Sequence, residues 1–172
     1  MTTGQGRNPG WETDELFVRF LEKEFPEVKF VWNAPRFSYQ LRAGAPTVFL
    51  GEPQPNFGLL TLHELGHGLC RHKDYTRSVE RIKIESEAWE RAKTAFLKMQ
   101  EQARDGWSMV IDGKDVALAE ILPEWDEDFV QAKLDTYRDW LHTKSKCKKC
   151  GLTMYQAEDA SWHCPRCEAF TL

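Results

Sequence analysis

The sequence predicts an α+β fold, in which a small sheet is followed by long helices and a cysteine-rich C-terminal segment. Three observations support this prediction. Short segments with alternating or β-branched residues cluster between residues 28 and 51. Apolar residues then recur at helical spacing over longer segments. Beyond residue 143 the chain becomes polar, and four cysteines occur there in two pairs.

The sheet region is preceded by a helix and contains three strands. Residues 11–25 carry apolar residues at helical spacing, with Thr13 as the expected N-cap and Pro26 after the last turn. The expected strands are residues 28–32, 37–44 and 46–51, the last two joined by a turn. Residues 1–10 are small and polar, so we expect a flexible tail there.

Three further helices are expected after the strands. The first contains the sequence LLTLHELGHGLCRHKDY and begins just beyond Pro55; the others span about 78–104 and 126–142. Between them, the pair Asp112–Gly113 indicates a turn, but its flanks can be strand or helix. We therefore expect a tail over 1–10, a main domain over 11–143 and a small cysteine-rich domain over 144–172.

Composition and charge limit the classes of partner. The net charge of −4 gives no general attraction to nucleic acid or to anionic membranes. No apolar run reaches the roughly 20 residues that cross a bilayer, and the N-terminal residues lack the pattern of a signal peptide. We expect a cytoplasmic protein without a membrane partner, where cysteines serve as metal ligands or free thiols more often than in disulfides.

The segment HELGH fits the pattern H-E-x-x-H. Residues four apart lie on one face of a helix, so His63 and His67 can direct both imidazoles at one zinc ion. Glu64 can then act as general base on a water activated by the metal. The alternative is a core helix that contains two hydrogen-bonded histidines.

A catalytic zinc usually has a third protein ligand, and the next helix offers Glu85 and Glu87. Glu85 falls on the apolar stripe of that helix, whereas Glu87 falls on the polar face, so we favour Glu85 as ligand. The alternative role of Glu85 is an ion pair with Arg81 or Arg77. His72 follows His67 by five residues and is expected to be exposed, which makes it a weaker candidate.

HELGH followed by ESEA on the next helix resembles the gluzincin metallopeptidases, in particular the ImmA/IrrE-type group. In that group the first glutamate of E-x-x-A is a ligand, and Glu85 occupies that position here. Residues 57–167 also resemble small bacterial proteins that join such a core to DTYRDWLH and a zinc ribbon. The resemblance implies a zincin-like sheet with an active-site helix and a ligand helix, and hydrolysis of peptide bonds. The ImmA/IrrE ending LLMP is replaced by FLKMQEQ, so no particular substrate is implied.

The cysteine pairs have the spacing C-x2-C-x13-C-x2-C, which is typical of a zinc ribbon. Four thiolates form a closed, structural zinc site; the alternatives are free thiols or disulfides. His163 adjoins the second pair but is a less favoured ligand. A tail of this size needs metal binding to fold. The expected ligands are Cys147, Cys150, Cys164 and Cys167.

The partner of the ribbon is less clearly indicated. The stretch KSKCKK suggests nucleic acid, but a four-thiolate zinc carries a charge of about −2 and acidic residues lie nearby. Nucleic acid binding is therefore not favoured over protein docking.

The main hypothesis is a zinc metallopeptidase, with one catalytic and one structural zinc, that cleaves a specific protein. Tyr137 or His142 would stabilise the oxyanion if their helix lines the cleft; otherwise Tyr137 is a core residue. Zincins bind peptides along a sheet edge, and residues 47–51 are the nearest candidate. The alternative is a non-catalytic regulatory module that acts through its ribbon in protein or nucleic-acid binding.

Overall fold

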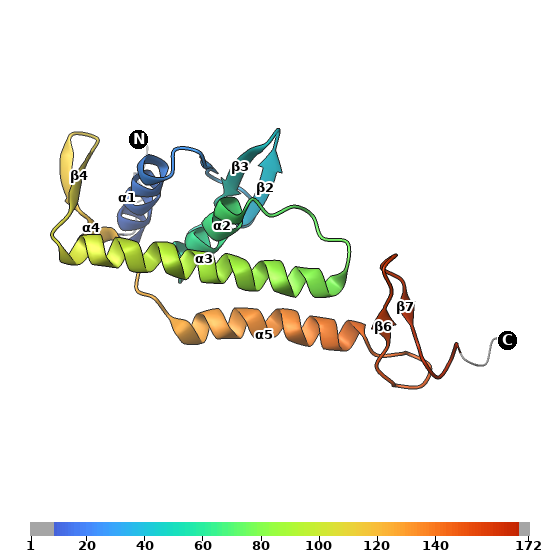
Figure 1. Cartoon of the computed structure of the whole chain (residues 1–172). Coiled ribbons are helices and arrows are strands. Elements are labelled where there is room, and N and C mark those ends of the chain that lie inside the picture. The colour runs from blue at the N-terminus through green and yellow to red at the C-terminus, as the bar shows by residue number, and fades with distance from the viewer. Residues whose placement is uncertain (1–8, 169–172) are drawn as a thin grey trace, which may run out of the picture. The chain divides into compact units, whose positions relative to one another are not determined.

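The computed structural model describes residues 9–168 and confirms the α+β class (Figure 1). The described residues form two compact units. The core unit contains the chain up to His72 and Glu87–Trp125, and the ribbon unit contains Lys73–Ser86 and the chain from Asp126 onward. Helix α3 (Ser78–Arg104) contributes its first turns to the ribbon unit and the rest to the core unit. None of the helices in the described part of the chain is long and apolar enough to cross a membrane.

The core unit begins with helix α1 (Pro9–Glu24). It starts at Pro9, so the prediction that Thr13 is the N-cap is wrong. Proline is well suited to the first turn of a helix because that position needs no amide hydrogen. Residues 1–8 of the predicted tail lie outside the described residues. Four apolar residues of α1 are buried in the core: Phe17, Val18, Phe20 and Leu21.

The main sheet has three strands in the order β1-β3-β2. Strand β3 pairs in parallel with β1 and antiparallel with β2, so it is the central strand. The expectation that residues 47–51 form a free edge is therefore wrong. A tight turn joins β2 to β3, so these two strands pair along one edge of β3, and β1 pairs along its other edge. The strands are β1 (Lys29–Val31), β2 (Ser38–Arg42) and β3 (Ala45–Phe49).

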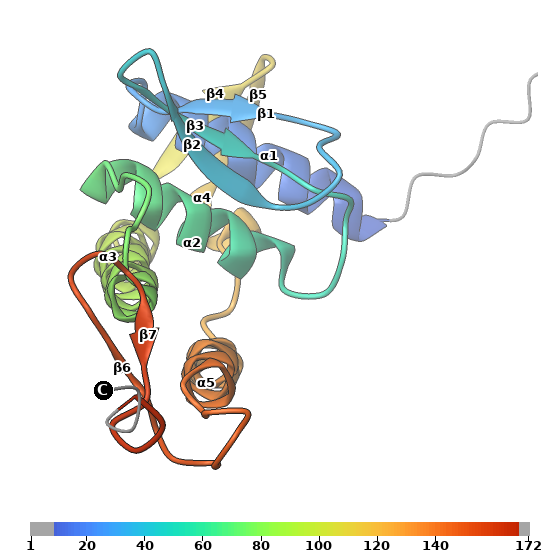
Figure 2. The ribbon, with the colours of Figure 1, turned by 90° about the vertical axis from the view of Figure 1, so that its right-hand side faces the viewer.

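Helix α2 (Phe57–Cys70) packs against β2 and β3 and lies along one face of the sheet (Figure 2). Its side chains Leu59, Leu62 and Leu65 are fully buried. The helix ends where Arg71 adopts a left-handed conformation, with φ of 52°. The chain turns back at this point, and the amide of His72 donates to the carbonyl of His67.

Helix α3 has the predicted bounds, and Glu80 stabilises its start. The carboxylate of Glu80 accepts hydrogen bonds from the amides of Thr76 and Arg77 and from the Arg77 side chain. These bonds, those from Arg77 above all, lower the pKa of Glu80 to about 2. The apolar stripe expected on α3 comprised Ile82, Trp89, Ala92, Phe96 and Met99. Its last four residues are buried, and Ala88 is buried beside them, whereas Ile82 is only half-buried.

The ambiguous segment after α3 is a hairpin followed by a short helix. Strands β4 (Ser108–Ile111) and β5 (Lys114–Ala117) pair antiparallel, and α4 (Leu118–Ile121) follows. Asp112 and Gly113 both have positive φ, which confirms the predicted turn.

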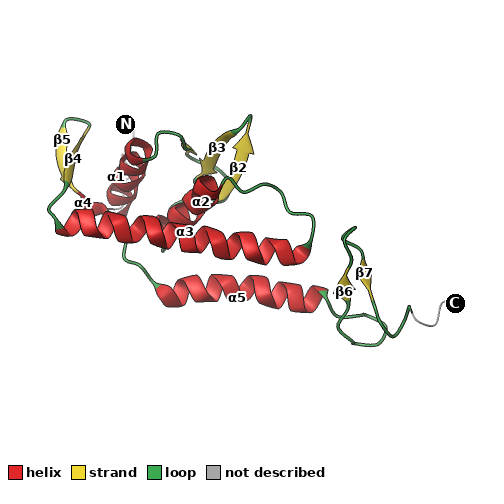
Figure 3. Cartoon of the chain, viewed as in Figure 1, coloured by secondary structure: helices red, strands yellow, loops and turns green. Residues whose placement is uncertain are grey.

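The ribbon unit contains α5 (Glu127–Lys144) and the strands β6 (Tyr155–Gln156) and β7 (Trp162–His163) (Figure 3). Asp126 caps α5 by accepting a hydrogen bond from the amide of Phe129. The first turn of α3 is joined to both parts of this unit. The amide of Ser78 donates to the Gln156 side chain, and its hydroxyl accepts from Lys144.

Candidate metal centres

His63 and His67 lie one turn apart on α2 and converge. Their Nε2 atoms are 3.2 Å apart. The two residues are 6% and 7% exposed, so both rings are held inside the protein. Helical spacing accounts for the convergence, since residues i and i+4 share one face. The pair therefore presents two nitrogen donors to one point.

Glu85 supplies an oxygen to the same group. One ligand atom each from His63, His67 and Glu85 lie within 4.8 Å of one another. Glu85 is only 8% exposed, and the guanidinium of Arg81 lies 3.8 Å from its carboxylate. The structure thus places Glu85 in the group and also beside Arg81, one of the two arginines expected as its alternative ion-pair partner. The three residues can bind a metal ion.

Glu64, the expected general base, follows His63 directly on α2 and is half-buried. A carboxylate in this position is more accessible than the two histidines beside it.

Aromatic rings fix the two imidazoles. Trp89 stacks on His63 with ring centroids 4.3 Å apart. Tyr39, from strand β2, lies parallel to His67 at 5.9 Å. The Tyr39 hydroxyl is buried and has no hydrogen-bond partner among the described residues, and burial raises its pKa. Strand β2 therefore runs directly beside the histidine pair.

His72 contradicts the prediction that it would be exposed, because only 9% of its side chain is accessible. Its Nδ1 lies 2.8 Å from Nδ1 of His67, and its Nε2 lies 3.3 Å from the carboxylate of Glu87. The left-handed turn at Arg71 directs His72 back over the helix end. Sequence spacing could not reveal this, since an arginine gives no signal for such a turn.

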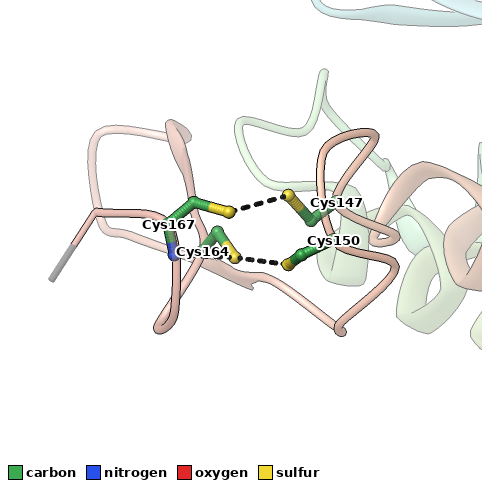
Figure 4. Close-up of side chains that lie close together, drawn as sticks. All are labelled: Cys147, Cys150, Cys164 and Cys167. Carbon is green, nitrogen blue, oxygen red and sulfur yellow. Dashed lines mark hydrogen bonds between the residues drawn. The ribbon is translucent and has the colours of Figure 1, made fainter. Parts of the chain in front are cut away.

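The four ribbon cysteines form a second group (Figure 4). The Sγ atoms are 3.8 Å apart for Cys147 and Cys167 and 3.5 Å apart for Cys150 and Cys164. All are free thiols, since a disulfide would hold its sulfurs about 2.05 Å apart. This group can also bind a metal ion, and its arrangement is compatible with a zinc ribbon.

The local field already favours one thiolate in this group. Hydrogen bonds from the amides of Cys150 and Lys149 lower the pKa of Cys147 to about 6. Hydrogen bonds among the thiols, with Cys150 first, raise the pKa of Cys167 to about 12. A bound cation would favour the thiolate form of all four.

The remaining candidates lie outside both groups. Tyr137 packs under Arg81, whose guanidinium is 5.1 Å from the ring centroid. His142 is exposed near the end of α5. His163 contacts Glu168 and the Ser161 hydroxyl, at 2.7 and 2.6 Å. The described residues thus provide two ligand groups, neither of which includes these three side chains.

Comparisons with known proteins identify no relative of this chain. The chain matches no family model, and neither curated proteins nor solved structures show significant similarity to it.

Proposed function

We propose that the protein is a zinc-dependent metallopeptidase with a catalytic zinc at His63, His67 and Glu85 and a structural zinc in the ribbon. The observation that carries this proposal is the convergence of two imidazoles and one carboxylate beside Glu64. Three such ligands leave one position open, which is the typical arrangement of a catalytic zinc.

The distances support zinc in both groups. With Zn–N bonds of about 2.0–2.1 Å, two tetrahedral nitrogen ligands lie about 3.3 Å apart. The two Nε2 atoms are separated by 3.2 Å. Zn–S bonds of about 2.3 Å similarly place sulfurs about 3.8 Å apart. The sulfurs of Cys147 and Cys167 are 3.8 Å apart, and those of Cys150 and Cys164 are 3.5 Å apart.

The proposed reaction is hydrolysis of a peptide bond. A zinc ion held by His63, His67 and Glu85 would supply Lewis acidity, which would polarise the substrate carbonyl and acidify water. Glu64 takes a proton from the attacking water as its oxygen bonds to the carbonyl carbon. The C–N bond then breaks, and Glu64 returns the proton to the leaving amine. The products are an amine and a carboxylic acid, which loses its remaining proton to solvent at neutral pH.

Strand β2 is the proposed docking edge for an extended substrate. It is an edge strand of the sheet, and its Tyr39 stacks on His67. A peptide that pairs with β2 would pass the histidine pair. The substrate we propose is one specific protein of the cytoplasm.

The test combines metal counting with a search for cleavage. The purified protein should hold two zinc ions, and His63→Ala should hold one. In a peptide library made from a digested proteome, the wild type should produce new termini, whereas Glu64→Gln should keep both metals and produce none. Equal cleavage by wild type and Glu64→Gln would overturn the catalytic role. Two metals without any cleavage would instead favour the regulatory module that acts through its ribbon.

A further inference from the structure

A continuous chain of side-chain hydrogen bonds within the core unit joins His67, His72 and Glu87. The Nδ1 atoms of the two histidines are 2.8 Å apart, and Nε2 of His72 is 3.3 Å from the Glu87 carboxylate. The His72 side chain is 9% exposed and that of Glu87 is 42% exposed. The chain therefore runs from the buried metal group to the surface of α3.

Hydrogen positions along this chain follow from the role of His67. Its Nε2 lies 3.2 Å from Nε2 of His63, and as the metal donor of the proposed site this nitrogen would carry no proton. Its hydrogen is then on Nδ1, which donates to Nδ1 of His72. The His72 hydrogen is consequently on Nε2, which donates to Glu87. Both of these N–H groups then have an acceptor in the chain, which ends at the Glu87 carboxylate.

We propose that His72 and Glu87 are positioning residues for the ligand His67, an inference that rests on the proposed zinc site. His72 fixes the tautomer and ring orientation of His67, and Glu87 does the same for His72. A hydrogen bond to the second nitrogen of a ligand imidazole also makes it a stronger donor, which increases metal affinity. Outer partners of this kind are usually a carboxylate or a carbonyl. Here an imidazole is inserted between the ligand and the carboxylate.

This role differs from direct ligation by Glu87. The ligand group among the described residues contains Glu85 and does not contain Glu87. The Glu87 carboxylate instead contacts the far nitrogen of His72. Glu87 should therefore affect the metal only while His72 is present to transmit its effect.

The experiment measures metal affinity in the whole 172-residue chain, with metal bound at the four ribbon cysteines. Cobalt is the probe, because its visible bands at a nitrogen and oxygen site differ from the thiolate charge-transfer bands of the ribbon. The variants are His72→Phe, His72→Asn, Glu87→Gln and the double variant His72→Phe with Glu87→Gln. Glu90→Gln, an exposed residue on the same helix, is the matched control. Thermal unfolding followed by circular dichroism checks that each variant is folded.

His72→Phe should weaken cobalt binding at the histidine site about 10-fold, as is typical for loss of an outer partner. His72→Asn should retain most of the affinity, because its amide oxygen can occupy the position of Nδ1. Glu87→Gln should cause a smaller loss in the wild type and no further loss beside His72→Phe. Glu90→Gln should have no effect.

Two results would overturn the proposal. One is an unchanged affinity in folded His72→Phe, and the other is an equal loss from Glu87→Gln in both backgrounds, which would indicate direct ligation. Neither result depends on cleavage, so failure of this proposal can be distinguished from failure of the proposed catalytic role of Glu64. If His63→Ala holds as much metal as the wild type, the site itself is absent and both proposals fail.

Discussion

A methyl group on Gly66 would lie 2.1 Å from the carbonyl oxygen of Ala88, so α2 and α3 meet backbone to backbone. Gly66 adjoins His67, and Ala88 follows Glu85 by one helical turn. The contact therefore controls how closely the histidine helix approaches the helix that carries Glu85. A glycine inside a helix costs about 1 kcal/mol relative to alanine, and this approach explains why one is present.

Gly66→Ala should destabilise the protein by about 1–3 kcal/mol, because neither backbone can move without separating the helices. It should also weaken metal binding at the histidine site. Gly68→Ala is the matched control. Its added methyl would lie 3.5 Å from Pro46 and 3.6 Å from Val28, an ordinary contact, so it should be neutral or stabilise by up to about 1 kcal/mol. Urea unfolding and metal counting test this difference, and equal effects of the two substitutions would contradict it.

Periodicity predicted the positions that repeat along one element. The bounds of α3 and the burial of Glu85 follow from one apolar stripe, and the cysteine group follows from its spacing. Contacts between elements could not be predicted in this way. The approach of Ala88 to Gly66 and the central place of β3 depend on how separate segments pack. The burial of His72 depends on the left-handed backbone conformation of Arg71, which no local sequence pattern predicts.

Arg81→Met should destabilise the ribbon unit by about 1–2 kcal/mol. The Arg81 guanidinium lies 5.1 Å from the ring centroids of both Tyr137 and Trp140, and each such contact contributes about 0.5–1 kcal/mol. Arg138→Met is the control, since that side chain is 65% exposed and forms ion pairs with Asp135 and Asp139 at the surface of α5. Thermal unfolding of both variants should show a clear loss for Arg81→Met and little change for Arg138→Met. A larger loss at Arg138 would show that the aromatic contacts of Arg81 contribute little.

Cys147→Ser should remove one metal equivalent and unfold the ribbon, because three remaining thiols cannot complete a closed four-thiolate site. The histidine site should keep its metal. Cys70→Ser is the control, since Cys70 is exposed and lies outside the cysteine group. Elemental analysis and near-ultraviolet circular dichroism would measure the two effects. Retention of both metals by Cys147→Ser, or a loss of metal from Cys70→Ser, would contradict the assignment.

Asp14→Asn should stabilise the protein at pH 7. Burial raises the pKa of Asp14 in α1 from 3.8 to about 6, so its charged form is disfavoured in the folded state. The folded state then binds more protons than the unfolded state between about pH 4 and pH 6. This contribution to stability is therefore present at low pH and is lost as pH rises through about 6. Asparagine and aspartate have similar helix propensity, so the substitution isolates the charge.

The stabilisation by Asp14→Asn should therefore be largest near pH 7 and should disappear below about pH 4, where Asp14 is neutral in both states. It should be modest, because Asp14 is only half-buried and water screens its charge. Glu27→Gln, at an exposed position in the turn after α1, should change the unfolding temperature little at either pH. Thermal unfolding at pH 4 and pH 7 gives the four comparisons. A stabilisation by Asp14→Asn that is equal at both pH values would show that it does not arise from the buried charge.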